Sequence, residues 1–358
     1  MEPRDLSALS EYVPGRGTEE VARELGLAPD DLVKLSSNEN PYGPSRLAVE
    51  AIEGAAPNVH RYPTAVHADL TAKLAAKWEV AESQVWVTAG ADGFIDYLSR
   101  AMLEPGDEVL VPAPGFSYYG MSARYHHGDA NTYELSGDDD FALTADVVLD
   151  GYDGERIVYV TSPHNPTGAT MPLGEVRALA DRVDEETLVV VDEAYGEFAA
   201  VPSAASLLDR YDNVAVARTF SKAYGLAGVR IGYGLVPGAW GDAYARVNTP
   251  FAASEIACRA ALAALDDDEH VERTVAGARE SRRYLREELD ATTWESGANF
   301  VLADVGDASA VAEASQAEGV IVRDCTSFGL PSCVRISCGT DAETRQAVET
   351  LNRILGGE

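Results

Sequence analysis

A single lysine stands out as a candidate for covalent catalysis. The chain has four lysines, and Lys222 is the one that follows position 77, in the sequence Arg-Thr-Phe-Ser-Lys at 218–222. A lysine amine can form a Schiff base with an aldehyde. Asp192, in the sequence Asp-Glu-Ala-Tyr at 192–195, could pair with a pyridinium nitrogen and keep it protonated. These two side chains are suited to a cofactor that carries both groups.

A phosphate site is predicted nearby. The sequence Gly-Ala-Asp-Gly at 90–93 lies where an apolar run passes into a helical pattern, so its backbone N–H groups could hold a phosphate at a helix N-terminus. Ser221 and Arg230 could add a hydroxyl and a cation. An aldehyde, a pyridinium and a phosphate together describe pyridoxal 5′-phosphate (PLP). Read singly, Asp192 could be a strand-end cap and Lys222 a surface charge, but the combination makes those interpretations poor.

The elements that must position these residues form a repeating pattern. Short, nearly continuous apolar runs alternate with helical patterns such as 68–78 and 173–182, which is typical of parallel strands buried on both faces. The predicted strands are 84–88, 108–111, 157–161, 188–191, 214–217 and 231–236. Five of these runs are followed by a polar or glycine-rich patch. In open α/β sheets, ligands bind at such strand ends. We therefore predict an α/β fold with a large doubly wound, mainly parallel sheet.

The pattern changes beyond about residue 245. Ser254 is placed to cap a helix that ends near 265, and a longer helical stripe follows over 271–289. Strands are then predicted at 300–303, 320–323 and 334–337, with a helix at 308–316. A capping box at 340–343 opens a last helix. We predict three parts: an N-terminal arm at 1–35 that joins the small domain, a large PLP-binding domain at 36–245, and a small α+β domain at 246–358.

The motifs resemble those of the fold-type I PLP-dependent aminotransferases. Within class II of these enzymes, they are most similar to the histidinol-phosphate aminotransferase family. The resemblance covers nearly the whole chain. It rests on the sequences at 34–44, 61–63, 165–168, 192–195, 218–230, 296–300, 319–323 and 334–340.

The resemblance implies roles for individual residues. Lys222 would hold PLP and move protons, Asp192 would bind the pyridine nitrogen, and Tyr195 with Asn165 would bind the 3′-oxygen. The remaining cofactor contacts would come from Ala91, Asp92, Gly93, Phe116, Thr219, Ser221 and Arg230, and from Tyr62 of a neighbouring subunit in a homodimer. Arg335 and Arg323 would bind substrate anions, and Tyr12 and Asn40 would line the substrate pocket. His164 stands where the family usually has Asn, so packing and functional roles are both open for it.

The implied reaction is transamination of L-histidinol phosphate with 2-oxoglutarate, which yields imidazole-acetol phosphate and glutamate in histidine biosynthesis. Two alternatives use the same cofactor: a lyase similar to threonine-phosphate decarboxylase, and an aromatic amino-acid aminotransferase. The sequence does not rank histidinol phosphate against aromatic amino acids. A non-catalytic PLP-fold regulator would need an attached DNA-binding domain or a lost lysine, and neither is seen.

Charge and composition indicate the environment in which the protein works and exclude several classes of partner. The formal net charge is −31 over 358 residues, and the acidic residues occur throughout the length. We interpret this acidity as adaptation to high internal salt, where self-repulsion is screened. No basic stripe for nucleic acid, no secretory signal, no apolar run of membrane-spanning length and no metal motif is visible. The four cysteines do not form a disulfide framework. We expect a soluble cytoplasmic protein.

Overall fold

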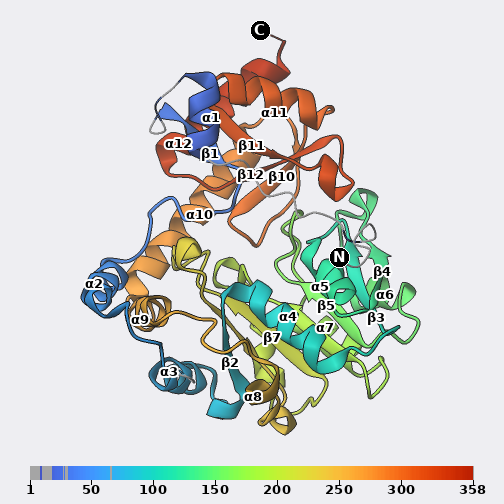
Figure 1. Ribbon diagram of the computed structural model, residues 1–358. Helices are drawn as coiled ribbons and strands as arrows, with labels where there is room; N and C mark the ends of the chain where they lie inside the picture. The colour runs from blue at the N-terminus through green and yellow to red at the C-terminus, as the bar shows by residue number, and fades with distance from the viewer. Residues whose placement is uncertain (1–8, 10–17, 27, 29–30, 65–66, 358) are drawn as a thin grey trace, which may run out of the picture.

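The computed structural model describes residues 9, 18–26, 28, 31–64 and 67–357. Figure 1 shows a larger part and a smaller part, with the long helix α10 (Asp268–Glu288) extending between them. The larger part is built on a seven-stranded sheet and the smaller part on a five-stranded sheet. Among the described residues, no helix is both long and apolar enough to cross a membrane.

The large sheet has the predicted α/β character. Its strand order is β2-β8-β7-β6-β5-β3-β4, and β8 runs antiparallel to both of its neighbours while the other pairings are parallel. All six predicted strands are present within two residues of their expected limits. The strands are β2 (Val85–Thr88), β3 (Glu108–Ala113), β4 (Asp129–Glu134), β5 (Ile157–Thr161), β6 (Leu188–Asp192), β7 (Val214–Thr219) and β8 (Gly232–Leu235).

Successive side chains of the central strands enter two separate cores. In β5, Val158 and Val160 pack in one core while Ile157 and Tyr159 pack in the other. This alternation explains why the strands read as continuous apolar runs, since both faces are covered by helices. The helices of this part are α2 (Arg46–Ala55), α3 (Ala68–Trp78), α4 (Gly90–Met102), α5 (Tyr118–Tyr125), α6 (Ala145–Asp150), α7 (Leu173–Ala180), α8 (Ala243–Val247) and α9 (Glu255–Ala264). Helix α9 packs against α2 and α3.

The small sheet has the order β1-β11-β12-β10-β9. Its strands are β1 (Val33–Leu35), β9 (Thr292–Thr293), β10 (Phe300–Asp304), β11 (Val320–Asp324) and β12 (Cys333–Ser337). The helices α1 (Thr18–Leu25), α11 (Ala308–Ala317) and α12 (Asp341–Leu355) accompany it. The capping box that opens α12 is confirmed, because Thr340 Oγ1 accepts from the Glu343 backbone N–H and the Glu343 carboxylate accepts from the Thr340 backbone N–H. The three-part division of the chain remains a prediction.

Candidate active site

A cavity of about 900 Å³ lies between the two sheets and collects most of the predicted site residues. Chain segments from both sheets contribute to it, including the ends of β5, β6 and β7 and the strands β11 and β12. The predicted residues that line it are Ala91, Asp92, Phe116, Asn165, Asp192, Tyr195, Thr219, Ser221, Lys222, Arg230, Arg323 and Arg335.

The predicted phosphate end is formed where α4 begins. Gly90 has a φ of +81°, which glycine adopts readily, and a Cβ there would lie 2.6 Å from Nη2 of Arg230, so a side chain at this position would displace the guanidinium. Arg230 Nη2 donates to Asp92 Oδ2 at 3.0 Å. Ser221 lies on the same side, with its Oγ 3.5 Å from Arg230 Nη1. Helix N–H groups, a hydroxyl and a guanidinium form a donor set that suits a phosphate.

Asp192 lies at the end of β6 and is buried. Its Oδ2 accepts from the Tyr119 hydroxyl at 2.6 Å, and its Oδ1 accepts from the backbone N–H of Ala194 at 2.9 Å. Burial raises the pKa of the carboxyl from 3.8 to about 6, although the Tyr119 hydrogen bond acts in the opposite direction. A buried carboxylate of this kind would be stabilised by a cationic partner such as a pyridinium nitrogen.

Lys222 follows β7 and reaches the cavity beside Tyr195. Its Nζ lies 5.6 Å from the centre of the Tyr195 ring and donates to the carbonyl of Ser37 at 3.3 Å. Tyr195 is buried, and its ring packs edge-on against Phe300 of β10. The amine is therefore held at the junction of the two sheets.

Arg335 and Arg323 bring cations from the small sheet. Arg335, on β12, is 5% exposed, and it donates to Asn165 Oδ1 and, at 2.7 Å, to the carbonyl of Ser36. Arg323, on β11, is half-buried and donates to Ser327 Oγ at 3.1 Å. Both guanidinium groups also lie against the ring of Phe328. The arrangement can present two cations to a bound anion.

Three of the predicted residues that the structure describes are not among those that line the cavity. Gly93 faces Thr88, with its Cβ position 3.3 Å from Thr88 Cβ. Tyr62 is 83% exposed and lies in a separate groove beside α2 and α9. Asn40 donates to the carbonyl of Ala223 and to Thr274 Oγ1. Tyr12 falls outside the described residues.

The surroundings of His164 favour a packing role for this residue over a functional one. It is completely buried in the loop after β5, and its Nδ1 lies 2.9 Å from Thr167 Oγ1. Burial lowers the pKa of the imidazole to about 3, so it is neutral at physiological pH.

Two contacts of the site were not predicted. The Tyr119 hydroxyl binds Asp192, and the Asn38 side chain binds Tyr195. The sequence carries weak signals for both, since Tyr119 follows Phe116 closely and Asn38 lies within the family motif at 34–44. Neither signal identifies the partner, because each pair is more than 70 residues apart in sequence.

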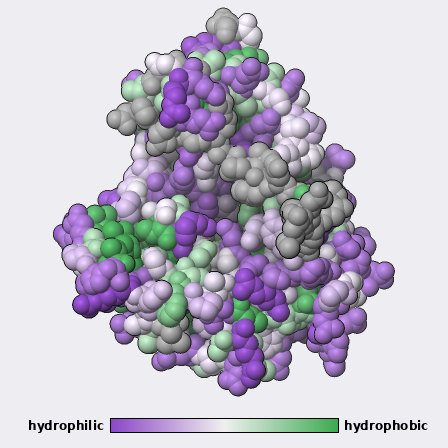
Figure 2. All heavy atoms as spheres, in the orientation of Figure 1, coloured by the Kyte–Doolittle hydropathy of each residue, from purple (hydrophilic) through white to green (hydrophobic). Residues whose placement is uncertain are grey.

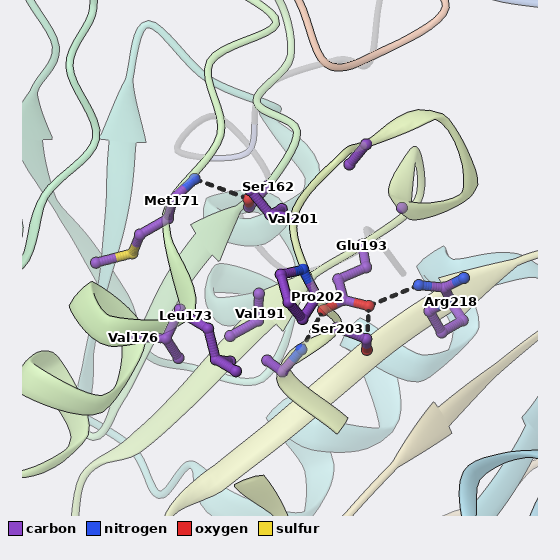
Figure 3. Close-up of a pocket in the computed structure, with 13 residues that line it drawn as sticks. Ser162, Met171, Leu173, Val176, Val191, Glu193, Val201, Pro202, Ser203 and Arg218 are labelled. Atoms are coloured by element: carbon purple, nitrogen blue, oxygen red, sulfur yellow. Dashed lines mark hydrogen bonds and ion pairs between the residues drawn. The ribbon is translucent and has the colours of Figure 1, made fainter. Parts of the chain in front are cut away.

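A buried cluster of charged residues lies next to the site residues in sequence. Arg218 of β7 binds Glu193 Oε2 at 2.6 Å and also binds Glu197, which joins the end of β7 to the turn that follows β6. Figure 3 shows Glu193 between Arg218 and Ser203, whose hydroxyl donates to the same carboxylate at 2.6 Å. The cluster thereby ties the segment of Asp192 and Tyr195 to the segment of Lys222.

The residues fit PLP. Asp192 offers a buried anion to the pyridine nitrogen, Lys222 offers an amine to the aldehyde, and the start of α4 with Ser221 and Arg230 offers donors to the phosphate. Phe116 is placed on the cavity wall, where its ring could stack on the cofactor. PLP is the cofactor of this protein.

Comparisons with known proteins agree with this arrangement. Residues 30–351 match the family model described as aminotransferase class I and II. The chain is 71% identical to a histidinol-phosphate aminotransferase of Haloferax volcanii over 99% of this chain and 98% of that protein. Among solved structures it resembles a histidinol-phosphate aminotransferase of Sinorhizobium meliloti in complex with PLP, with a TM-score of 0.87, 30% identity and coverage of 99% and 100%. It also resembles an aspartate aminotransferase of Thermus thermophilus with maleate, with a TM-score of 0.82, 26% identity and coverage of 99% and 100%. The chain belongs to the class I and II aminotransferase family.

Proposed function

We propose that the protein transfers the amino group of L-histidinol phosphate to 2-oxoglutarate, forming imidazole-acetol phosphate and glutamate in histidine biosynthesis. The observation that carries this proposal is the 71% identity to a histidinol-phosphate aminotransferase along nearly the full length of both chains. The reaction requires one site to bind a phosphate monoester and a dicarboxylate in turn. The cavity supports the proposal, because two arginines, Arg323 and Arg335, line it.

The anion contacts explain how one site can serve both substrates. Arg335 and Arg323 lie opposite each other on neighbouring strands and both line the cavity. A guanidinium is planar and can bind either a phosphate or a carboxylate with two hydrogen bonds. Arg335 is the more buried of the two and donates to both Asn165 and the Ser36 carbonyl, whereas Arg323 donates to Ser327.

The residues around the cofactor position would bind the cofactor, orient it and move protons. PLP, when bound, supplies an electron sink that stabilises the electron pair left when a proton leaves the substrate carbon. Asp192 would keep the pyridine nitrogen protonated, and Asn165 and Tyr195 would orient the 3′-oxygen. The Lys222 amine would remove a proton from one carbon and return it at another. Ala91, Asp92, Thr219, Ser221 and Arg230 would hold the phosphate.

We also propose a homodimer. Apolar side chains are exposed near α2 and α9, where Figure 2 shows a hydrophobic patch. Val59 and Phe251 are exposed there, and the Phe251 ring lies 4.8 Å from the ring of Tyr62. Such a cluster is expected to be covered by another protein surface, and a second copy of the chain would bring Tyr62 to the neighbouring phosphate site.

The reaction is tested with purified enzyme and PLP in molar KCl. We expect glutamate to form from L-histidinol phosphate only when 2-oxoglutarate is present, and Lys222→Ala to abolish both this activity and the visible absorption of the bound cofactor. Release of CO₂ from threonine phosphate without an amino acceptor would contradict the proposal in favour of a lyase. A higher kcat/KM for phenylalanine than for histidinol phosphate would contradict it in favour of an aromatic aminotransferase.

The dimer is tested by light scattering during gel filtration in the same buffer. We expect a mass of two chains for the wild type. Tyr62→Phe should keep that mass and weaken PLP binding, because it removes the hydroxyl and leaves the ring. A monomeric wild type with full activity would refute the shared site.

A further inference from the structure

One short segment touches several predicted site residues in succession. The carbonyl of Ser36 accepts from Arg335, and the carbonyl of Ser37 accepts from the Lys222 amine. The side chain of Asn38 donates to the Tyr195 hydroxyl oxygen. The segment at 36–38 leads out of β1 of the small sheet, so it connects that sheet to the reacting end of the large one.

Asn38 is held by hydrogen bonds on every side. Its backbone N–H donates to Ser337 Oγ at 2.8 Å, and that hydroxyl donates to Asn38 Oδ1 at 2.9 Å. Its carbonyl accepts from Asn299 Nδ2 at 3.1 Å. The residue is 1% exposed and has a φ of +53°, a conformation that asparagine tolerates better than most residues. Because Ser337 engages Oδ1, the Nδ2 group faces Tyr195.

The direction of the hydrogen bond to Tyr195 has a chemical consequence. Asn38 Nδ2 lies 2.9 Å from the Tyr195 oxygen and can only donate. The Tyr195 oxygen is therefore an acceptor in this pair, and its own proton remains available to a second partner. Tyr195 lines the cavity beside Lys222, so a ligand in the cavity can accept a hydrogen bond from the Tyr195 hydroxyl.

We propose that Asn38 is a positioning residue that directs the Tyr195 hydroxyl proton toward the 3′-oxygen of PLP. The inference rests on the proposed function, in which Tyr195 contacts that oxygen. A donor at the 3′-oxygen stabilises negative charge there. When the Schiff base of Lys222 is deprotonated, its nitrogen carries no positive charge to stabilise the negative 3′-oxygen. The hydrogen bond from Tyr195 therefore stabilises the deprotonated form more than the protonated form. Asn38 therefore helps to keep the pKa of the Schiff base low.

The test is a pH titration of the visible absorption of the PLP-bound enzyme in molar KCl. Asn38→Gly removes the donor, and glycine adopts the positive φ without strain. We expect it to raise the pKa of the Schiff base by roughly one pH unit, because a shift of that size corresponds to the loss of one hydrogen bond. Asn38→Ser is the second variant in case the glycine variant does not fold, because its hydroxyl ends one bond short of the Nδ2 position.

Two comparisons separate positioning from a structural effect. Asn299→Ala is the matched control: it removes a buried amide that touches the Asn38 carbonyl and leaves the Nδ2 contact, so it should not move the titration. In a Tyr195→Phe background, Asn38→Gly should produce no further shift. These variants leave in place the other charged groups that line the cavity, namely Lys34, Glu39, Asp92, Asp192, Lys222, Arg230, Arg323 and Arg335.

The outcomes are distinct. If both Asn38 variants titrate like the wild type, or if the shift persists in the Tyr195→Phe background, the role of Asn38 is overturned while the proposed function stands. If the wild type develops no visible band that depends on Lys222, the proposed function itself fails.

Discussion

Arg323 and Arg335 occupy directly opposed positions on the antiparallel strands β11 and β12. Opposed residues on neighbouring strands place their side chains on the same face of the sheet, and like charges in that relation repel each other. Both side chains line the same cavity. The repulsion would be relieved by an anion between them, so the pair is arranged for binding rather than for stability of the small sheet.

Replacing Arg335 by lysine should impair both half-reactions. The lysine keeps the charge and loses the planar fork together with the contacts to Asn165 and Ser36. A loss of about 2 kcal/mol corresponds to a fall in kcat/KM of roughly 30-fold for both histidinol phosphate and 2-oxoglutarate. Arg345→Lys, at a surface ion pair with Asp341, is the control and should leave both values unchanged. Wild-type rates for Arg335→Lys would remove Arg335 from the substrate site.

Asp192 should make the cofactor-free protein less stable as the pH rises. The folded-state pKa of about 6 lies above the ordinary 3.8, so the folded carboxyl retains its proton in a range where the unfolded chain loses it. The stability lost between about pH 4 and pH 6 amounts to at most about 3 kcal/mol. Asp192→Asn lacks this titration, so urea unfolding of the two apo proteins should diverge across that range and stay parallel above it.

Asp146→Asn, at an exposed position, controls for the removal of one negative charge. Bound PLP should reverse the comparison, because the pyridinium stabilises the ionised form of Asp192. Identical pH dependence of the apo wild type and apo Asp192→Asn would exclude the raised pKa.

Breaking the buried ion cluster should cost more than breaking a surface pair. Arg218→Met leaves the carboxylates of Glu193 and Glu197 buried without their cation, which typically costs about 3–5 kcal/mol. The matched control is Arg156→Met, whose ion pair with Glu186 is exposed and contributes less than about 1 kcal/mol. Denaturant unfolding of both variants measures the difference. Equal losses would show that the cluster is not acting as a buried network.

Salt should stabilise the fold strongly. With a net charge of −31, repulsion between acidic residues is felt over about 10 Å in 0.1 M salt and over about 3 Å in 1 M salt. Thermal unfolding should therefore shift to higher temperature in molar KCl than in dilute buffer. Sucrose at matched osmolality tests whether screening is responsible, since it carries no charge and should stabilise less. Equal stability in dilute and concentrated KCl would refute the interpretation of the acidity.

Local sequence pattern was sufficient for the framework of the large sheet. The central strands are buried on both faces, so each appears as an uninterrupted apolar run, and the residues that follow them were identifiable as a site at one edge. The exception is β4 (Asp129–Glu134), an edge strand with largely polar, partly exposed side chains that carries no such run. Lys222 and Asp192 were predicted for the same reason, because Asp192 ends β6, Lys222 stands three residues after β7, and each side chain is suited to one role.

What the sequence by itself determined, then, is which chemical groups reach the edge of the sheet: the amine of Lys222, the carboxylate of Asp192 and the donors near Gly90. Only the tertiary structure decided how these groups are oriented. Asn38 meets Tyr195 across 157 residues of chain, and Arg218 joins two strand ends. Such contacts depend on how separate elements pack and on which buried polar atoms then lack water. A local pattern of apolar and polar residues cannot encode that pairing.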